Sequence, residues 1–555
     1  MPRHHLQDHK HLGRIGFTVV ALWAALLLHL VQSPPVEVEP TSDAPGLKRV
    51  SLPLQEFPKP SFDGAVGWIN SGPIDLAALK GKIVLLDFWT YCCINCHHIL
   101  PDLEKLEQKY KNELVVIGVH SGKFDAERNT ENIRRKVAEY RIKHPVANDA
   151  EMIIWERFQV NAWPTLVLID PDGDIVGARS GEGHYELFDE VIGKIAEEYR
   201  KAGKLDETPI LFESEESYYA NKPLLFPGKV LADEKSNRLF ISDTGHNRIV
   251  QTDLDGGNPV IIGDGQPGLV DGDFATARFN RHQGLCLEGD ILYVADTNNH
   301  AIRAVNLKEK TVETLAGDGE QARRDPRVPF EGPGKSSQIA SPWDLIQLPG
   351  SRDIYIAMAG PHQIWKFDPE TNVISSYAGS GYENILDGNL ATARFAQPSG
   401  LATDGENLFI ADSEVSGVRV IREIGGDNPR VDRIVGKGLF VFGDRDGRGP
   451  EEVRLQHCLG LAFGGGKLYI ADTYNNKVKV CDPQTNVVNT FVGTTESGDS
   501  DDPPQFYEPG GLSIAGDSLY VADTNNHKIK VVDLKTGKTR TLEIPDLTPP
   551  APPES

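Results

Sequence analysis

Three cysteines lie close together in the run Cys92-Cys93-Ile94-Asn95-Cys96. Cys93 and Cys96 form a Cys-x-x-Cys pair, the spacing of dithiol sites that exchange with disulfides. The thiolate is the nucleophile in this exchange, so one sulfur would attack a substrate disulfide and the other would release the product. The sequence therefore predicts thiol–disulfide chemistry at this pair.

The elements around the pair must hold it at the start of a helix. The apolar run 83–86 before it is typical of a buried strand. Apolar residues then recur at helical spacing, at Ile99, Leu100, Leu103 and Leu106. The first turn of a helix has unpaired N–H groups and partial positive charge, which favour a thiolate at Cys93.

The run from Asp87 to Cys96 resembles the active-site region of the thioredoxin fold, and Pro164 matches the position of that family's cis-proline. The resemblance implies that Cys93 attacks, that Cys96 resolves, and that Asp87 is a buried carboxylate assisting proton transfer. It implies that Pro164 faces the cysteines through a cis peptide bond, which is uncommon in proteins. The neighbours expected to modulate the redox properties of the pair are Cys92, Trp89 and Trp163.

The sequence departs from the thioredoxin pattern at two points. The residues between the cysteines are Ile94-Asn95 and not Gly-Pro, so the redox potential does not carry over. Cys92 stands where the family has tryptophan. This third thiol could pair with Cys96, bind a soft metal with His97 or His98, or be a buried thiol with no role.

Residues 48–204 read as alternating strands and helices around this site. Strands are expected at 114–120, at 145–149, and as a hairpin at 166–170 and 174–179, with helices near 153–158 and 184–200. His120 and His184 are interpreted as loop or surface histidines and not as proton carriers or ligands.

A repeat of about 50 to 60 residues fills the second half of the chain, and a repeat of this length with four short strands predicts a β-propeller. Six copies predict six blades, and the motifs resemble NHL repeats. The clearest copies are Leu292-Tyr293-Val294-Ala295-Asp296-Thr297-Asn298-Asn299-His300, Leu468 to Asn476 and Leu519 to His527; weaker ones start at Leu239, Ile354 and Leu408. The motif Asp-Thr-Asn-Asn-His is interpreted as a turn signature, because Asp and Asn bond nearby backbone in tight turns.

A second recurrence places an arginine in three connections between blades, at Arg278, Arg394 and Arg454. These residues could line a shared binding mouth for an acidic ligand, or they could bond neighbouring loop carbonyls. The isolated cysteines Cys286, Cys458 and Cys481 are expected to be small core residues.

Composition and charge narrow the classes of partner. The net charge of −23 argues against nucleic acid, whose phosphates need clustered Lys and Arg. Six cysteines in 555 residues are too few for a disulfide scaffold. Residues 1–14 are basic, and residues 15–32 form an apolar segment just long enough to span a bilayer, with a cleaved signal peptide as the rival interpretation. The basic flank predicts domains outside the cytoplasm, in the periplasm.

The expected fold is therefore an α/β thioredoxin-like domain followed by an all-β six-bladed NHL propeller, an order that resembles the family of NHL repeat-containing protein 2. The expected boundaries are a basic tail (1–14), a membrane anchor (15–32), a linker (33–47), the thioredoxin-like domain (48–204), a connector (205–222), the propeller (223–545) and a disordered Pro-rich tail (546–555).

The predicted function is that of a membrane-anchored thiol–disulfide oxidoreductase acting on protein thiols or disulfides. Its propeller would be a platform for a protein or ligand, and no cofactor or resident metal is expected. A protein outside the cytoplasm would need a membrane electron donor to act as a reductant. The alternatives are a redox-silent scaffold, a copper-handling thioredoxin-like protein and a propeller enzyme.

Overall fold

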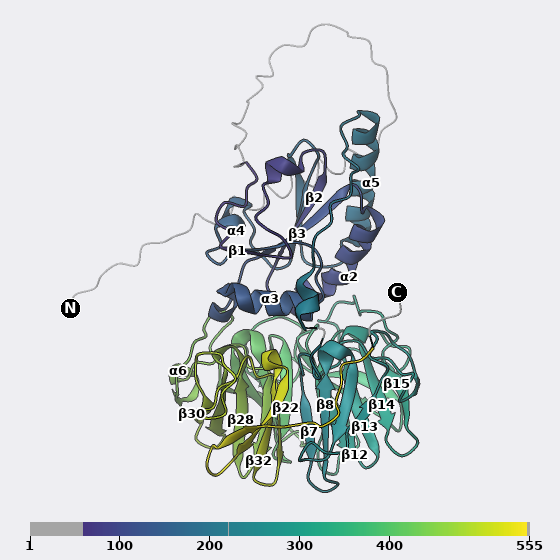
Figure 1. Cartoon of the computed structure of the whole chain (residues 1–555). Helices are drawn as coiled ribbons and strands as arrows, with labels where there is room; N and C mark the ends of the chain where they lie inside the picture. Colours follow the sequence, from purple (N-terminus) through teal and green to yellow (C-terminus); the bar gives the residue numbers. More distant parts are fainter. Residues whose placement is uncertain (1–58, 220, 552–555) are drawn as a thin grey trace, which may run out of the picture.

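The computed structural model describes residues 59–219 and 221–551, which form two stacked domains (Figure 1). A smaller α/β domain sits on one face of a disc of β-sheets. The predicted basic tail, anchor and linker, and the first residues of the predicted thioredoxin-like domain, lie outside the described residues. Among the helices that are described, none is both long enough and apolar enough to cross a membrane.

The α/β domain is built on a six-stranded sheet with the order β1-β4-β3-β2-β5-β6. β2 and β3 are parallel, and β2 and β5 are antiparallel. The strands are β1 (Gly67–Ile69), β2 (Ile83–Trp89), β3 (Leu114–His120), β4 (Val146–Asn148), β5 (Thr165–Ile169) and β6 (Ile175–Ser180). The helices are η1 (Leu76–Leu79), α2 (Ile94–Lys109), η2 (Asp125–Arg128), α3 (Thr130–Glu139), α4 (Ile153–Arg157), α5 (Tyr185–Lys201) and η3 (Glu215–Tyr219).

Both faces of this sheet are buried, because successive side chains of β2 point to opposite sides. Ile83 and Leu85 pack with α2 and α5. Val84, Leu86 and Phe88 pack on the other side, where α4 contributes. Burial on both faces explains why the central strands are continuous apolar runs.

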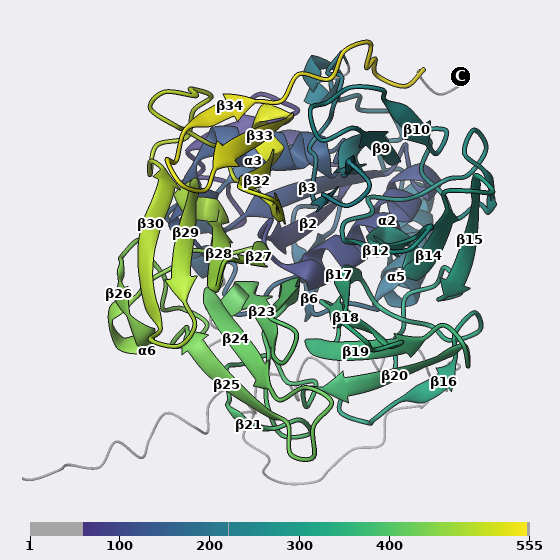
Figure 2. The ribbon, with the colours of Figure 1, turned by 90° about the horizontal axis from the view of Figure 1, so that it is seen from below.

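The disc contains six sheets arranged around an axis, which confirms the predicted six-bladed propeller (Figure 2). Blade 1 comprises β7 (Val230–Asp233), β8 (Arg238–Asp243), β9 (Arg248–Thr252) and β10 (Val260–Ile262). Blade 2 comprises β11 (Gly272–Asp273), β12 (Leu285–Glu288), β13 (Ile291–Asp296), β14 (Ala301–Asn306) and β15 (Thr311–Ala316). Blade 3 comprises β16 (Glu331–Pro333), β17 (Pro342–Gln347), β18 (Ile354–Met358), β19 (Gln363–Asp368) and β20 (Val373–Ala378).

The remaining blades repeat this plan, with short 3-10 turns after the second long strand of most blades. Blade 4 comprises β21 (Gly388–Asn389), β22 (Pro398–Thr403), β23 (Leu408–Asp412), β24 (Gly417–Arg422) and β25 (Arg430–Val435). Blade 5 comprises β26 (Gly447–Arg448), β27 (Gly460–Gly464), β28 (Lys467–Asp472), β29 (Lys477–Asp482) and β30 (Val487–Gly493), with the short helix α6 (Gly449–Glu452). Blade 6 comprises β31 (Gly511–Ala515), β32 (Ser518–Asp523), β33 (Lys528–Asp533) and β34 (Thr539–Thr541). The turns are η4 (Thr244–His246), η5 (Thr297–Asn299), η6 (Ser413–Val415), η7 (Thr473–Asn475) and η8 (Thr524–Asn526).

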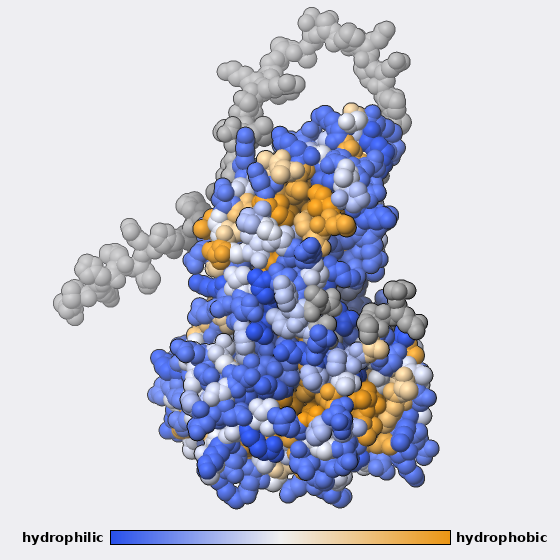
Figure 3. Space-filling model, in the orientation of Figure 1, coloured by the Kyte–Doolittle hydropathy of each residue, from blue (hydrophilic) through white to orange (hydrophobic). Residues whose placement is uncertain are grey.

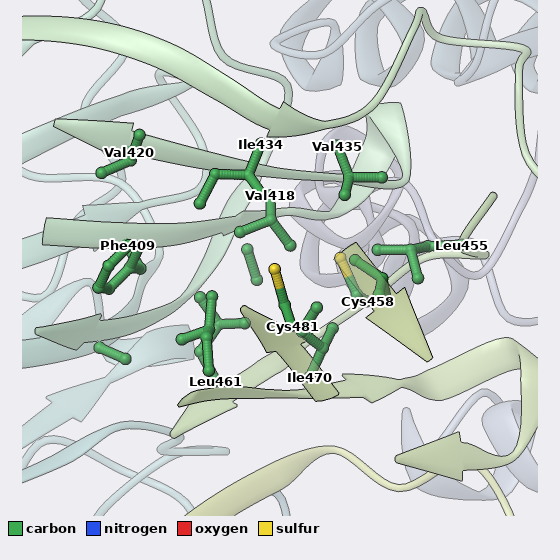
Figure 4. Close-up of a cluster of buried hydrophobic side chains, with 14 of the residues drawn as sticks. Phe409, Val418, Val420, Ile434, Val435, Leu455, Cys458, Leu461, Ile470 and Cys481 are labelled. Carbon is green, nitrogen blue, oxygen red and sulfur yellow. The ribbon is translucent and has the colours of Figure 1, made fainter. Parts of the chain in front are cut away.

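Apolar side chains between adjacent blades form the propeller core. Figure 4 shows the cluster between blades 4 and 5, where Cys458 and Cys481 lie among Val418, Ile434 and Ile470. Cys286 belongs to the corresponding cluster between blades 2 and 3. The prediction that these three cysteines are small core residues is confirmed.

A further cluster closes the ring between the first and last blades. Val230 and Ile241 of blade 1 pack with Ile529 of blade 6, and Leu542 and Leu547 complete the contact. Leu547 is only 9% exposed. The prediction of a disordered tail from residue 546 was therefore wrong at Leu547, because this apolar side chain fills the joint between two blades.

The aspartate that ends the second long strand of a blade is structural, as the turn interpretation predicts. Asp296 Oδ2 accepts from Asn299 in the same turn and from Arg303 in the next strand, each at 2.8 Å. Its Oδ1 accepts from the backbone N–H of Asn280 at 2.8 Å. The carboxylate thus ties a turn, a strand and the preceding loop together.

Candidate active site

Residues 90–93, which we call the cysteine loop, connect β2 to α2, as the sequence predicts. Cys93 is the residue before the first helical turn and is half-buried, whereas Cys96 is 1% exposed beneath it. The backbone N–H of Cys96 donates to the Cys93 carbonyl at 3.0 Å. All six cysteines are free thiols in the structure. This arrangement suits an accessible attacking sulfur and a shielded resolving one.

Asp87 lies on β2 behind the pair and is fully buried, and neither of its carboxylate oxygens has a hydrogen-bond partner among the described residues. Burial raises the pKa of Asp87 to about 7. Burial, the hydrogen bond with Cys93 and the nearby charge of Asp87 raise the pKa of the Cys96 thiol well above its usual value. A carboxyl with a pKa near neutrality can exchange a proton with a thiol at working pH.

The peptide bond between Trp163 and Pro164 is cis, as the resemblance to thioredoxin implies. Trp163 packs in the same apolar cluster as Cys93, and its Nε1 donates to the Ser121 carbonyl at 2.9 Å. Trp89 is buried in this cluster with its ring edge-on to the His120 ring. The structure thus brings Trp89, Trp163 and the three cysteines into one cluster.

His120 corrects one interpretation, because it is neither a loop nor a surface residue. It ends β3, is fully buried, and its Nε2 accepts from the Tyr91 backbone N–H at 3.1 Å. Burial lowers the pKa of His120 to about 3, so the ring stays neutral and supports the cysteine loop. His184 is half-buried before α5, with Nε2 3.1 Å from the Ser180 carbonyl oxygen.

The two histidines that follow the pair have partners other than Cys92. His97 Nε2 lies 3.0 Å from the Tyr91 carbonyl oxygen. His98 lies 2.8 Å from a Glu182 carboxylate oxygen and 2.7 Å from Ser341 Oγ. The alternative in which Cys92 binds a soft metal with His97 or His98 gains no support from these contacts, because both rings contact other groups. The histidine near Cys92 is His457, from the propeller.

Six equivalent positions of the propeller, one per blade, surround its axis at the end that faces the α/β domain. We call these residues the axial ring. Each has a positive φ, between 46° and 63°. Figure 1 shows the α/β domain above this face, and Figure 2, viewed through the disc from below, shows β2 and α2 behind its centre. The axial ring consists of Phe226, Arg281, Ser341, Gln397, His457 and Glu508.

The axial ring holds the cysteine loop directly. Gln397 Oε1 accepts from the Ile94 backbone N–H at 2.9 Å, and Gln397 Nε2 donates to the Cys92 carbonyl at 2.8 Å. Glu508 Oε1 accepts from the Tyr91 hydroxyl at 3.1 Å. All of these groups are buried, so each bond replaces one that water can no longer supply.

Charged groups of α3 complete the junction. Lys136 Nζ lies 2.9 Å from Glu139 Oε2 and 3.2 Å from Glu508 Oε2, and Arg281 donates to Glu139 Oε1 at 2.7 Å. On the visible side of the molecule the junction is mainly hydrophilic, whereas apolar side chains gather higher on the α/β domain (Figure 3). The two domains are thus joined by matched polar groups.

A cavity of about 40 Å³ lies between the cysteine loop and the axis of the propeller. Its lining includes Tyr91, Cys92, His457 and Glu508. None of the three arginines predicted to form a binding mouth is in this lining. Arg278 pairs with Asp264 at 2.7 Å, Arg394 lies over the Tyr382 ring, and Arg454 donates to the carbonyls of Pro450 and Val453. Of the three, Arg454 makes the contact with loop carbonyls that the alternative describes, whereas Arg278 contacts a carboxylate and Arg394 an aromatic ring.

Sequence reasoning missed the axial ring, although a signal for it exists. Each of its residues stands three positions before a glycine or a residue equivalent to it, as in Arg281-His282-Gln283-Gly284 and Gln397-Pro398-Ser399-Gly400. The side chain at this position differs in every copy, whereas the strands around it are alike. A variable position inside a regular repeat indicates a specific contact.

Comparison with known proteins agrees with this architecture. The family described as Thioredoxin-like matches residues 81–175, and the NHL repeat family matches residues 506–532. The chain is 41% identical over 542 residues to NHL repeat-containing protein 2 of Gallus gallus, covering 90% of this chain and 73% of that protein. The chain belongs to the family of NHL repeat-containing protein 2.

Two further relatives match different shares of this chain. Protein SUPPRESSOR OF QUENCHING 1, chloroplastic, of Arabidopsis thaliana is 43% identical over 521 residues, covering 89% of this chain and 48% of that protein. The chain thus spans about half the length of the plant relative. Thiol-disulfide oxidoreductase ResA of Bacillus cereus is 35% identical over 122 residues, covering 22% of this chain and 68% of that protein. The NHL repeat-containing protein 2 relatives match both domains, whereas this likeness covers a fifth of the chain.

Proposed function

We propose that this member of the NHL repeat-containing protein 2 family is a thiol–disulfide oxidoreductase of protein substrates, with Cys93 as the attacking and Cys96 as the resolving cysteine. The observation that carries the proposal is the placement of a half-buried Cys93 before the first turn of α2, with Cys96 and the unpartnered Asp87 buried behind it. The likeness of the α/β domain to thiol-disulfide oxidoreductase ResA of Bacillus cereus supports the same chemistry.

In the reducing direction, the Cys93 thiolate attacks a substrate disulfide, forms a mixed disulfide and releases one substrate thiolate. Asp87, placed beside the pair, takes the proton of Cys96. The Cys96 thiolate then attacks the Cys93 sulfur, which forms the Cys93–Cys96 disulfide and releases the second substrate sulfur as a thiolate. Two electrons pass from the pair to the substrate, and the opposite direction oxidises a substrate dithiol.

In this proposal the propeller is part of the active site, because Gln397 and Glu508 hold the backbone and side chains next to Cys93. It therefore limits which substrates reach the sulfur, and it serves as the docking platform. A redox-silent scaffold could show the same contacts between the propeller and the cysteine loop. A measurement of disulfide exchange is therefore needed to distinguish the two functions.

The test is disulfide reduction by the full chain with dithiothreitol as electron source. Cys93→Ser should abolish turnover, and Cys96→Ser should accumulate a mixed disulfide with substrate that mass spectrometry detects. Cys481→Ser, in the propeller core, is the control and should keep turnover. Equal activity of Cys93→Ser and the parent chain would leave the redox-silent scaffold as the better description.

We also propose that residues 15–32 anchor the chain in a membrane, with both domains in the periplasm and a membrane protein as electron donor. The support is the sequence pattern alone, in which a basic stretch precedes an apolar run that has no Asp, Glu, Lys or Arg from 15 to 31. Protease added to intact spheroplasts should then digest both domains while a cytoplasmic marker survives. Protection until lysis would refute this location.

A further inference from the structure

One buried cluster is not used by the exchange chemistry described above. Cys92 of the cysteine loop, Glu414 after β23 and His457 of the axial ring place a sulfur, a carboxylate oxygen and a ring nitrogen within 4.8 Å of one another. All three residues are buried, and they come from both domains. These are the three ligand types that bind zinc in proteins.

We propose that Cys92, Glu414 and His457 form a binding site for a divalent metal of the zinc class, which fastens the cysteine loop to the propeller. This role concerns the third cysteine and is separate from the exchange reaction of Cys93 and Cys96. Its histidine is not His97 or His98, which the sequence offered as one alternative, but a residue more than 350 positions further along the chain.

The ring of His457 is fixed in place for such a role. It stacks on Tyr474 with centroids 4.5 Å apart and packs against Phe124 at 5.3 Å. Its Nδ1 has no hydrogen-bond partner among the described residues, and it lies 3.9 Å from Glu414 Oε1. Buried polar atoms in proteins are nearly always paired, so an unpaired ring nitrogen aimed at a carboxylate calls for an explanation. A cation between the two atoms would bind both.

The charges around the cluster also favour a cation. The Glu127 carboxylate is buried and accepts from the backbone N–H groups of Cys92, Lys123 and Phe124 at 2.8–2.9 Å. Lys123 forms an ion pair with Glu414. Two carboxylates, those of Glu127 and Glu414, therefore lie close to Cys92. Ionisation of Cys92 would add a third negative charge, and a divalent cation would then make the whole cluster neutral.

Without a metal, burial and the charges of Glu127 and Glu414 raise the pKa of the Cys92 thiol well above its usual value. Metal binding would release the thiol proton to water and form a metal–sulfur bond with the thiolate. Neighbouring ligand atoms of a tetrahedral zinc ion lie roughly 3.3–3.8 Å apart, so the side chains must close by about 1 Å. The axial cavity that Cys92 and His457 line gives a water molecule access to the fourth position.

The test uses the full chain carrying Cys93→Ser and Cys96→Ser, so that the exchange pair cannot supply a thiolate. Cobalt(II) is the probe, because its bond to a thiolate gives a near-ultraviolet charge-transfer band. This band does not respond to histidines alone, which matters because the sequence has histidines at 4, 5, 9 and 11. We expect the band to saturate at one cobalt per chain and to disappear when zinc is added.

Adding Cys92→Ser should abolish the band, and His457→Gln should weaken cobalt binding at least tenfold. Cys458→Ser is the matched control, since this buried cysteine lies next to His457 in sequence and should leave the band unchanged. Circular dichroism shows that each variant is folded. A band that survives Cys92→Ser, or a folded parent chain that shows no band, would overturn the proposal.

Discussion

Gln397 of the propeller and Cys92 of the cysteine loop are joined by a hydrogen bond of 2.8 Å between Gln397 Nε2 and the Cys92 carbonyl oxygen. The same side chain accepts from the Ile94 N–H on the other side of Cys93. One glutamine thus spans the attacking cysteine. The conformation of the loop around Cys93 therefore depends on a residue that lies about 300 positions away in the chain.

Gln397→Ala should destabilise the junction between the domains and loosen the loop. The substitution leaves the Ile94 N–H and the Cys92 carbonyl buried without partners, at a cost of about 1–3 kcal/mol in unfolding free energy. Alkylation of Cys93 by a bulky maleimide should accelerate several-fold. Gln347→Ala, at a half-buried position in blade 3, should change neither quantity.

Asp87→Asn should raise stability and lower activity together. The folded chain keeps the Asp87 proton up to about pH 7, whereas the ordinary pKa of an aspartate in an unfolded chain is 3.8. Because the folded state binds more protons in this window, stability falls as the pH rises from 3.8 to 7. The amide removes this loss, and we expect the variant to be more stable by roughly 2–4 kcal/mol at pH 8.

Denaturant unfolding at pH 5 and pH 8 measures this effect, and the gain should be smaller at pH 5. Turnover at pH 7 should fall because the proton acceptor for Cys96 is lost. Asp174→Asn, at an exposed turn, is the control. A variant that is less stable than the parent chain at pH 8 would contradict the assignment of Asp87 as an unpaired buried carboxyl.

Lys136→Met should weaken the attachment of α3 to the propeller. Lys136 neutralises Glu139 and Glu508, and its loss leaves Glu508 in a buried site with no other ion pair among the described residues. Removing one member of a buried ion pair costs about 3–5 kcal/mol. Limited proteolysis between the domains, near residues 205–222, should become faster. Lys194→Met, in an exposed pair with Glu190, should leave the cleavage rate unchanged.

The propeller should fold without the α/β domain, because each blade packs on its neighbours. A chain of residues 221–551 should give an all-β far-ultraviolet spectrum and a cooperative melt. A chain that ends at 541 loses Leu542 and Leu547 from the joint between blades 1 and 6, and its melting temperature should fall clearly. Equal melting temperatures would show that this joint does not depend on the C-terminal residues.

Local patterns in the sequence were enough to predict the two folds. The apolar run 83–86, the Cys-x-x-Cys pair and Pro164 are each recognisable from their immediate neighbours, and their order identifies the thioredoxin-like site. The six repeats likewise predict six blades, since each copy carries its own strands and turn. Both predictions rest on short patterns that do not require the tertiary contacts to be known.

The surroundings of Cys92 could not be predicted in this way. Its neighbours Glu127, Glu414 and His457 come from three separate segments, and they meet only because the α/β domain docks on one end of the propeller. His120 was misplaced for a related reason. Its position at the end of a predicted strand gives no sign that its ring contacts the cysteine loop, which comes earlier in the chain.

The axial ring has a consequence for how this protein can vary. A propeller of similar blades could accept its partner domain in any of six rotational settings, yet here only one setting brings Gln397 to Cys92 and Arg281 to Glu139. A turn by one blade would place Ser341 or His457 where Gln397 now bridges Cys93. The six different side chains therefore fix the rotational position of the α/β domain on the propeller. Exchanging two blades would preserve the disc but misplace the side chains that hold the cysteine loop. A circular permutation that keeps the blade order would leave these contacts intact.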